Sequence, residues 1–188
     1  MRSLLGVSDF IDKILSFIAN IGAWLGLLLV LVVCYDVSSR YFGVPKPWGL
    51  NSTQVQEFEY WLHTFLFALV MGFAYTKQAH VRIDLLREQC SSRVKFIIES
   101  LGIVCFLMTY AVMGIIYSYS YAYTSFLEGE VSKSTIGLSN IWILKSMIPT
   151  MFALIFLAGL SNLIKCIAGL TGDLPKERYH EALGGDHS

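Results

Sequence analysis

Four runs of the sequence contain no Asp, Glu, Lys or Arg, and they limit the possible folds more than any other feature. They cover residues 14–35, 60–76, 100–127 and 146–164. A helix that crosses a bilayer needs roughly 20 mostly apolar residues, and its backbone amides must be paired within the segment. The sequence therefore predicts an all-α membrane protein with four transmembrane helices.

The composition agrees with this fold class and sets approximate boundaries. Hydrophobic residues make up 55% of the chain and charged residues only 15%, which is unusual for a soluble domain. We place the spans at about 14–35, 57–77, 96–123 and 146–166, within a membrane domain of residues 1–170. Residues 171–188 are polar and predict a cytoplasmic tail without fixed structure.

The basic residues alternate between the two sides of the predicted bundle. Five of them lie in the link between the second and third spans, three follow the fourth span and two precede the first, whereas each of the other two links holds only two. Lys and Arg collect on the cytoplasmic side of a membrane. Both termini are therefore predicted to be cytoplasmic.

The two outer links carry their own structural signals. Pro45, Pro47 and Gly49 break the first helix, and Thr53 with Gln56 predicts a capping box that starts the second. Residues 137–145 are apolar and predict a segment that lies in the interface before Pro149 opens the fourth helix. We therefore expect short interfacial helices in these links.

The sequence offers little that points to chemistry. It contains no nucleotide-binding loop, no metal-ligand cluster and no nucleophile beside a base. The spans hold almost no ionisable residues of the kind that ion pathways use. We expect no enzyme activity, no cofactor and no nucleic-acid partner, and transport by this chain alone is disfavoured.

Two histidines leave open a second interpretation, a haem-binding membrane anchor of a respiratory complex. His63 and His80 are roughly 25 Å apart along a continuous helix at 1.5 Å per residue, so they cannot share one iron unless the helix breaks. The competing interpretation of His63 is an interfacial or interhelical hydrogen-bonding residue.

The segment KQAHVRIDLL, residues 77–86, places a group of charges directly after the second span. If the helix continues, His80 and Asp84 are i,i+4 neighbours, and Asp84 and Arg87 are i,i+3 neighbours that can pair. One interpretation is an ordinary positively charged link that binds lipid headgroups. The other is a fixed cytoplasmic corner or docking surface built around Asp84.

Four motifs in a fixed order resemble the small membrane subunit of the tripartite ATP-independent periplasmic (TRAP) transporters, the DctQ-like family. They are SSRYFGVP after the first span, Glu57 or Glu59 ahead of YWLHTFLFALVMGFAY, HVRID at residues 80–84, and GLSNIWILKSMIPTMFALI, which contains Trp142 and Pro149. One departure is LSN before Ile141, where the family pattern has a proline nearer Trp142. The resemblance covers most of residues 30–165.

The resemblance implies a part in a larger transporter of the bacterial inner membrane. A periplasmic substrate-binding protein captures an organic acid, of the C4-dicarboxylate or sialic acid type, and a large multi-span subunit carries it inward with sodium ions. The small subunit is implied to be a non-catalytic scaffold for the fixed part of an elevator-type carrier. Its partners are then the large subunit, the binding protein and membrane lipids.

The resemblance also implies roles for particular residues. His80, Arg82 and Asp84 are expected to fix the cytoplasmic corner, and Arg40 with Glu57 or Glu59 to anchor the outer side. Trp142 and Pro149 occupy positions that match the family pattern. All eight are interpreted as structural or subunit-interface residues.

Overall fold

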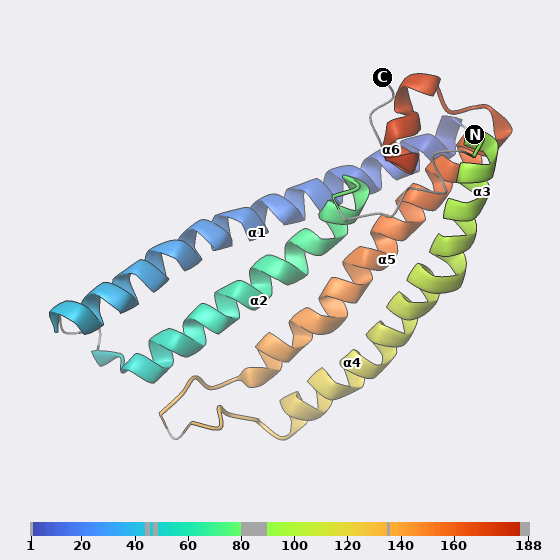
Figure 1. Ribbon diagram of the computed structural model, residues 1–188. Coiled ribbons are helices and arrows are strands. Elements are labelled where there is room, and N and C mark those ends of the chain that lie inside the picture. Colours follow the sequence, from blue (N-terminus) through green and yellow to red (C-terminus); the bar gives the residue numbers. More distant parts are fainter. Residues whose placement is uncertain (1, 44–45, 47–48, 80–89, 135, 185–188) are drawn as a thin grey trace.

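The computed structural model consists of long helices joined by short links (Figure 1). It describes residues 2–43, 46, 49–79, 90–134 and 136–184, and all regular elements in these ranges are helical. The elements are α1 (Arg2–Phe42), α2 (Ser52–Thr76), α3 (Ser92–Gly102), the π-helical turn η2 (Ile103–Met108), α4 (Thr109–Leu127), α5 (Ile141–Thr171), the 3-10 turn η3 (Lys176–Arg178) and α6 (Tyr179–Leu183).

The four long helical segments lie side by side in the order α1, α2, α5, α4 (Figure 1). Helix α5 is central, and 44% of its most apolar stretch is buried inside the protein, against 11% for α1 and 17% for the α3–α4 segment. The apolar side chains of α1 and α4 therefore face mainly outward. Both described chain ends lie at the same end of the bundle, beside the start of α3, and we call this the terminal end (Figure 1).

Three helical segments of the described chain are long and apolar enough to cross a membrane. They are Ser3–Phe42, Ser92–Leu127 and Ile141–Thr171. Helix α2 has 25 residues and covers most of the expected span 57–77, but it is not among the three. Glu59, His63 and Thr64 dilute its apolar stretch. Four spans thus stay a prediction, whereas the all-helical fold is confirmed.

Small residues let the central helices approach closely. A Cβ atom added to Gly72 on α2 would lie 2.7 Å from the backbone oxygen of Leu154 on α5, and one added to Gly22 on α1 would lie 2.9 Å from Val70 on α2. Contacts of this kind are typical of helices that associate in lipid through van der Waals packing. The row of helices is thus tightly joined at its centre.

The helix starts differ from two local expectations. The capping box of α2 is formed by Asn51 and Gln54, two positions before the predicted Thr53 and Gln56, because asparagine is a stronger N-cap than threonine. Helix α5 begins at Ile141 and contains Pro149, so the proline does not open the helix and residues 141–145 form no separate interfacial helix.

The predicted unstructured tail is also wrong for residues 173–184. The chain turns at Gly172, where φ is +81°, and η3 and α6 then fold back onto the bundle. Leu174, Ala182 and Leu183 are almost fully buried, in one hydrophobic cluster with Phe96 of α3 and Cys166 of α5. Three apolar residues within a polar stretch are enough to dock it, because the terminal end of the bundle leaves apolar surface uncovered.

Candidate anchoring and partner-binding sites

A stripe of large apolar side chains runs along the outward face of α1. Successive members are three or four residues apart, which places them on one side of a helix, and all are at least 37% exposed. We call this the α1 stripe, and it consists of Val7, Phe10, Ile14, Phe17, Ile21, Trp24, Leu28 and Leu31. A membrane-embedded face of this kind contacts either lipid or another membrane protein.

At the end of α1 away from the termini, Asp36 forms the centre of a charged cluster. Its side chain is 4% exposed and pairs with both Arg40 and Lys46, and Ser39 donates a hydrogen bond to its backbone oxygen at 2.9 Å. Carbonyls in the last turn of a helix have no intrahelical partner and this end is electronegative, so basic groups are favoured there. Arg40 is thus held at the end of α1 by Asp36, a residue that the sequence analysis did not single out.

The two glutamates expected near Arg40 have different environments. Glu57 accepts hydrogen bonds from the Ser132 hydroxyl and from the backbone N–H of Leu138 at 2.5 Å, so it fixes the link between α4 and α5. Glu59 faces the Asp36 cluster instead, and its Oε1 atom is buried without a hydrogen-bond partner. The structure therefore separates two residues that the sequence left as alternatives.

The same link contains a second ion pair. Lys145 of α5 pairs with Glu130, and its ammonium lies 3.9 Å from the centre of the Tyr121 ring. The hydrogen bond from Lys145 holds the pKa of Glu130 below its usual value. Together with Glu57, this pair ties the helix ends α2, α4 and α5 to one another.

Trp142 and Pro149 both lie in the first turns of α5. The Trp142 ring packs edge-on against Phe126 of α4, with ring centres 5.2 Å apart. Pro149 removes one backbone donor from the helix, and the hydroxyls of Ser146 and Thr150 donate to the carbonyls of Ile143 and Ser146 around it. Neither of these carbonyls is the one that Pro149 leaves without its usual backbone donor, which is the carbonyl of Lys145.

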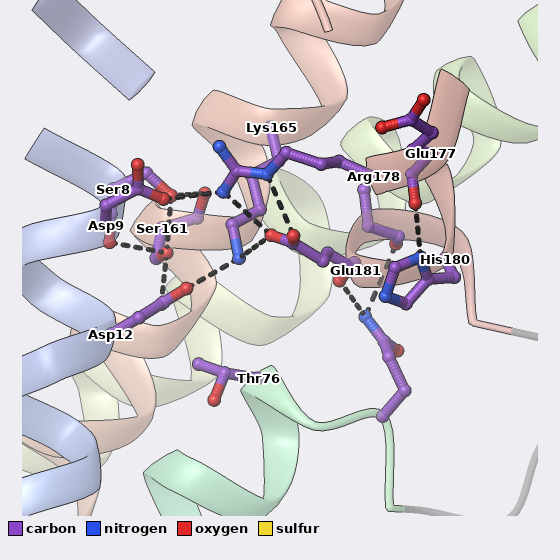
Figure 2. A network of polar contacts seen from close by, with 12 residues as sticks. Ser8, Asp9, Asp12, Thr76, Ser161, Lys165, Glu177, Arg178, His180 and Glu181 are labelled. Carbon is purple, nitrogen blue, oxygen red and sulfur yellow. Dashed lines mark hydrogen bonds and ion pairs between the residues drawn. The ribbon is translucent and has the colours of Figure 1, made fainter. Parts of the chain in front are cut away.

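At the terminal end, a network of polar contacts joins α1, α5 and α6 (Figure 2). Lys165 is only 3% exposed, and its ammonium lies 2.6 Å from Asp12 of α1 and 3.1 Å from Glu181 of α6. Ser161 donates to the second oxygen of Asp12 at 2.6 Å. A buried ammonium with two carboxylate partners fixes the relative positions of the helices that carry them.

Arg178 completes this network from the segment beyond α5. It donates to Glu181 at 2.8 and 2.9 Å and to Asp9 of α1 at 2.6 Å (Figure 2). These two carboxylates raise its pKa. Burial favours the neutral form of Glu181, but the hydrogen bonds from Arg178 and Lys165 outweigh burial and lower the pKa of Glu181 to about 2. The chain end is thus held to its beginning by charge.

His80, Arg82 and Asp84 lie outside the described residues, so the expected cytoplasmic corner keeps its status as a prediction. The residues that lead to it are described. Gln78 adopts a left-handed backbone conformation with φ of +55°, and its side chain donates to the backbone oxygens of Glu181 and Ala182 at 3.1 and 3.4 Å. The start of the predicted corner therefore contacts α6.

The haem interpretation finds no support in the described residues. His63 is exposed on α2, with its ring 4.7 Å from that of Phe67. No group of three or more His, Cys, Asp or Glu residues in the described ranges could hold a metal ion. The exposed ring on an outward face fits the interfacial interpretation of His63 better.

Of two charge pairings in these sites, one has a signal in the sequence and the other has none. Asp36 precedes Arg40 by four residues, which is the spacing of a helical ion pair. Asp12 and Lys165 are single opposite charges near the same end of two predicted spans. Their pairing needed the helix order, which spacing along the chain does not give.

The chain matches the model of a known protein family. The model of the family described as tripartite ATP-independent periplasmic transporters, DctQ component, matches residues 29–169. No curated protein and no solved structure matches the chain significantly. The matched range includes the Asp36 cluster, the link between α4 and α5, and Lys165, and it covers most of the chain. The chain therefore belongs to the DctQ family of TRAP transporter components.

Proposed function

We propose that this chain is the small membrane subunit of a sodium-coupled TRAP transporter for an organic acid and acts as a non-catalytic scaffold for the large transport subunit. The family gives the class of protein and the kind of partners, a large membrane subunit and a periplasmic binding protein. The organic acid is of the C4-dicarboxylate or sialic acid type, and sodium coupling takes place in the large subunit. The cargo is selected by the partners.

The distribution of charged residues in the described bundle supports the scaffold role. The ion pairs gather at its two ends, around Asp36 at one end and Lys165 at the other. The helix centres between them are joined by small-residue contacts. A brace needs apolar outer faces and polar anchors at both interfaces, which resist sliding and tilting.

The same arrangement supports four spans with both termini in the cytoplasm. Helix α2 lies between α1 and α5, two helices that can cross a membrane by length and composition. A helix enclosed by two spanning neighbours is carried through the bilayer with them. The basic residues of the link between the second and third spans and of the segment after α5 then lie on the cytoplasmic side of the bacterial inner membrane.

The test is affinity purification of the tagged chain from its native host in mild detergent, followed by mass spectrometry. We expect a large multi-span protein at near-equal amount. Sodium-driven uptake into liposomes should then require this chain, the large subunit and the binding protein together. Full uptake by the large subunit and binding protein without this chain would overturn the scaffold role.

A further inference from the structure

A polar cavity at the terminal end opens between α1, α2, α5 and α6. It has a volume of about 390 Å³, within the range of about 300–1,000 Å³ that is common for ligand pockets. Its ionisable lining residues are Asp12, Lys13, Lys77, Lys165, His180 and Glu181. Thr76 also lines the cavity, and in the view of Figure 2 it lies below Asp12, Lys165 and Glu181.

The charges that line this cavity do not cancel. Three lysines line it against two carboxylates, Asp12 and Glu181, and both carboxylates pair with Lys165. Lys13 and Lys77 are exposed and form no ion pair with a described residue, and the ammonium of Lys77 lies 5.5 Å from the centre of the Phe73 ring. The ammonium of Lys165 is already paired, so the ammonium groups of Lys13 and Lys77 remain at the cavity. Their positive charge favours the binding of an anion.

A second, apolar groove continues from this cavity along α1 and α2. Its volume is about 530 Å³, and it shares Lys13, Ser16 and Phe73 with the polar cavity. From there it passes Ala19 and Ala23 of α1 and Val70 of α2. The groove thus leads from the charged end of the bundle into the charge-free runs of both helices.

We propose that the cavity and the groove together form a binding site for one anionic phospholipid. The phosphate lies between Lys13 and Lys77, and one acyl chain lies in the groove toward Ala23 and Val70. We choose a phospholipid because of the way polar and apolar surfaces follow one another. A charged cavity of the size of a headgroup opens into an apolar channel at membrane depth, and a phospholipid has the same sequence of parts. Basic pockets between membrane helices commonly hold anionic headgroups.

The test is native mass spectrometry of the delipidated full-length chain with phosphatidylglycerol added, and with phosphatidylcholine of the same acyl chains as the comparison lipid. Lys13→Gln and Lys77→Gln should each weaken phosphatidylglycerol binding about fivefold, the ratio that corresponds to ~1 kcal/mol per basic residue near an anionic headgroup. Lys176→Gln is the matched control, since Lys176 is exposed at the same end and lines neither cavity.

A second pair of variants tests the acyl-chain part of the site. Ala23→Phe fills the groove and should also reduce binding, whereas Ile21→Phe, on the exposed face outside the groove, should not. Three results would each overturn the proposal. The first is equal binding of both lipids, and the second is unchanged phosphatidylglycerol binding when Lys13→Gln and Lys77→Gln are combined. The third is competition by inorganic phosphate without any effect of Ala23→Phe. None of these results would affect the purification test of the scaffold role.

Discussion

At the scale of single residues, Glu181 decides how the end of the chain is held. Among the described residues it is the one carboxylate that contacts both Lys165 and Arg178, and these two residues reach Asp12 and Asp9 of α1 as well. Removal of its charge would leave the buried Lys165 with a single partner. Removing one partner of a buried ion pair lowers the stability of the folded state by more than the intact pair contributes, because the other charge is left buried without a partner.

The lowered pKa of Glu181 gives a pH prediction. Its pKa is about 2 in the folded protein against 4.5 for the free side chain, so the folded state binds this proton less readily than the unfolded state. The resulting stabilisation is complete above pH 4.5 and is lost as the pH falls toward 2. It amounts to at most about 3 kcal/mol.

The measurement is thermal unfolding in detergent between pH 2 and 7 for the wild type and Glu181→Gln. We expect the difference between the two proteins to be largest above pH 4.5 and to disappear near pH 2. Glu177→Gln, at an exposed position in the same segment, should follow the wild type at every pH. A difference that does not change with pH would contradict the assigned ion pairs.

At the scale of elements, the contact between α2 and α5 depends on the absence of a side chain at Gly72. A methyl group there would lie 2.7 Å from the Leu154 backbone oxygen, and backbone cannot move aside as a flexible side chain can. The two helices would have to separate. This is overpacking, which typically costs about 1–3 kcal/mol.

We therefore expect Gly72→Ala to lower the unfolding temperature in detergent and to loosen α2 from α5. Gly102→Ala is the matched control, because Gly102 is also helical but a Cβ there would meet no atom within 4 Å. The control should leave stability unchanged or raise it by up to about 1 kcal/mol, since alanine favours helix. Equal effects of the two substitutions would argue against a close α2–α5 contact.

At the scale of the whole molecule, the described bundle has two chemically different ends. The terminal end carries the polar network of Figure 2, and the other end carries the Asp36 cluster and the link between α4 and α5 (Figure 1). The described parts of both chain ends lie together, so the termini share one side if the long helices span the membrane. This side is the cytoplasmic one in our proposal.

Cysteine labelling in cells tests that orientation. In a variant without Cys34, Cys90, Cys105 and Cys166, we would introduce Lys133→Cys in the link or Lys176→Cys near the chain end, both at exposed positions. A reagent that cannot cross the inner membrane should label position 133 in spheroplasts but reach position 176 only after lysis. The reverse pattern, or labelling of both positions in spheroplasts, would exclude cytoplasmic termini.

The sequence by itself determined the all-helical class, the apolar stretches of the helices and the family. These follow from hydropathy and from motifs, which are local properties of the chain. It also placed Arg40, Glu57 and Trp142 close to helix ends, where the structure has them, whereas Pro149 lies inside α5 and does not open it.

Only the tertiary structure decided which charges meet. Asp12 and Lys165 are far apart in the sequence, and the tail beyond Gly172 has the composition of a disordered segment. It docks because the folded bundle offers Phe96 and Cys166 as an apolar surface and Lys165 as a partner for Glu181. Long-range pairing depends on the order of the helices in space, and hydropathy along a single chain carries no information about that order.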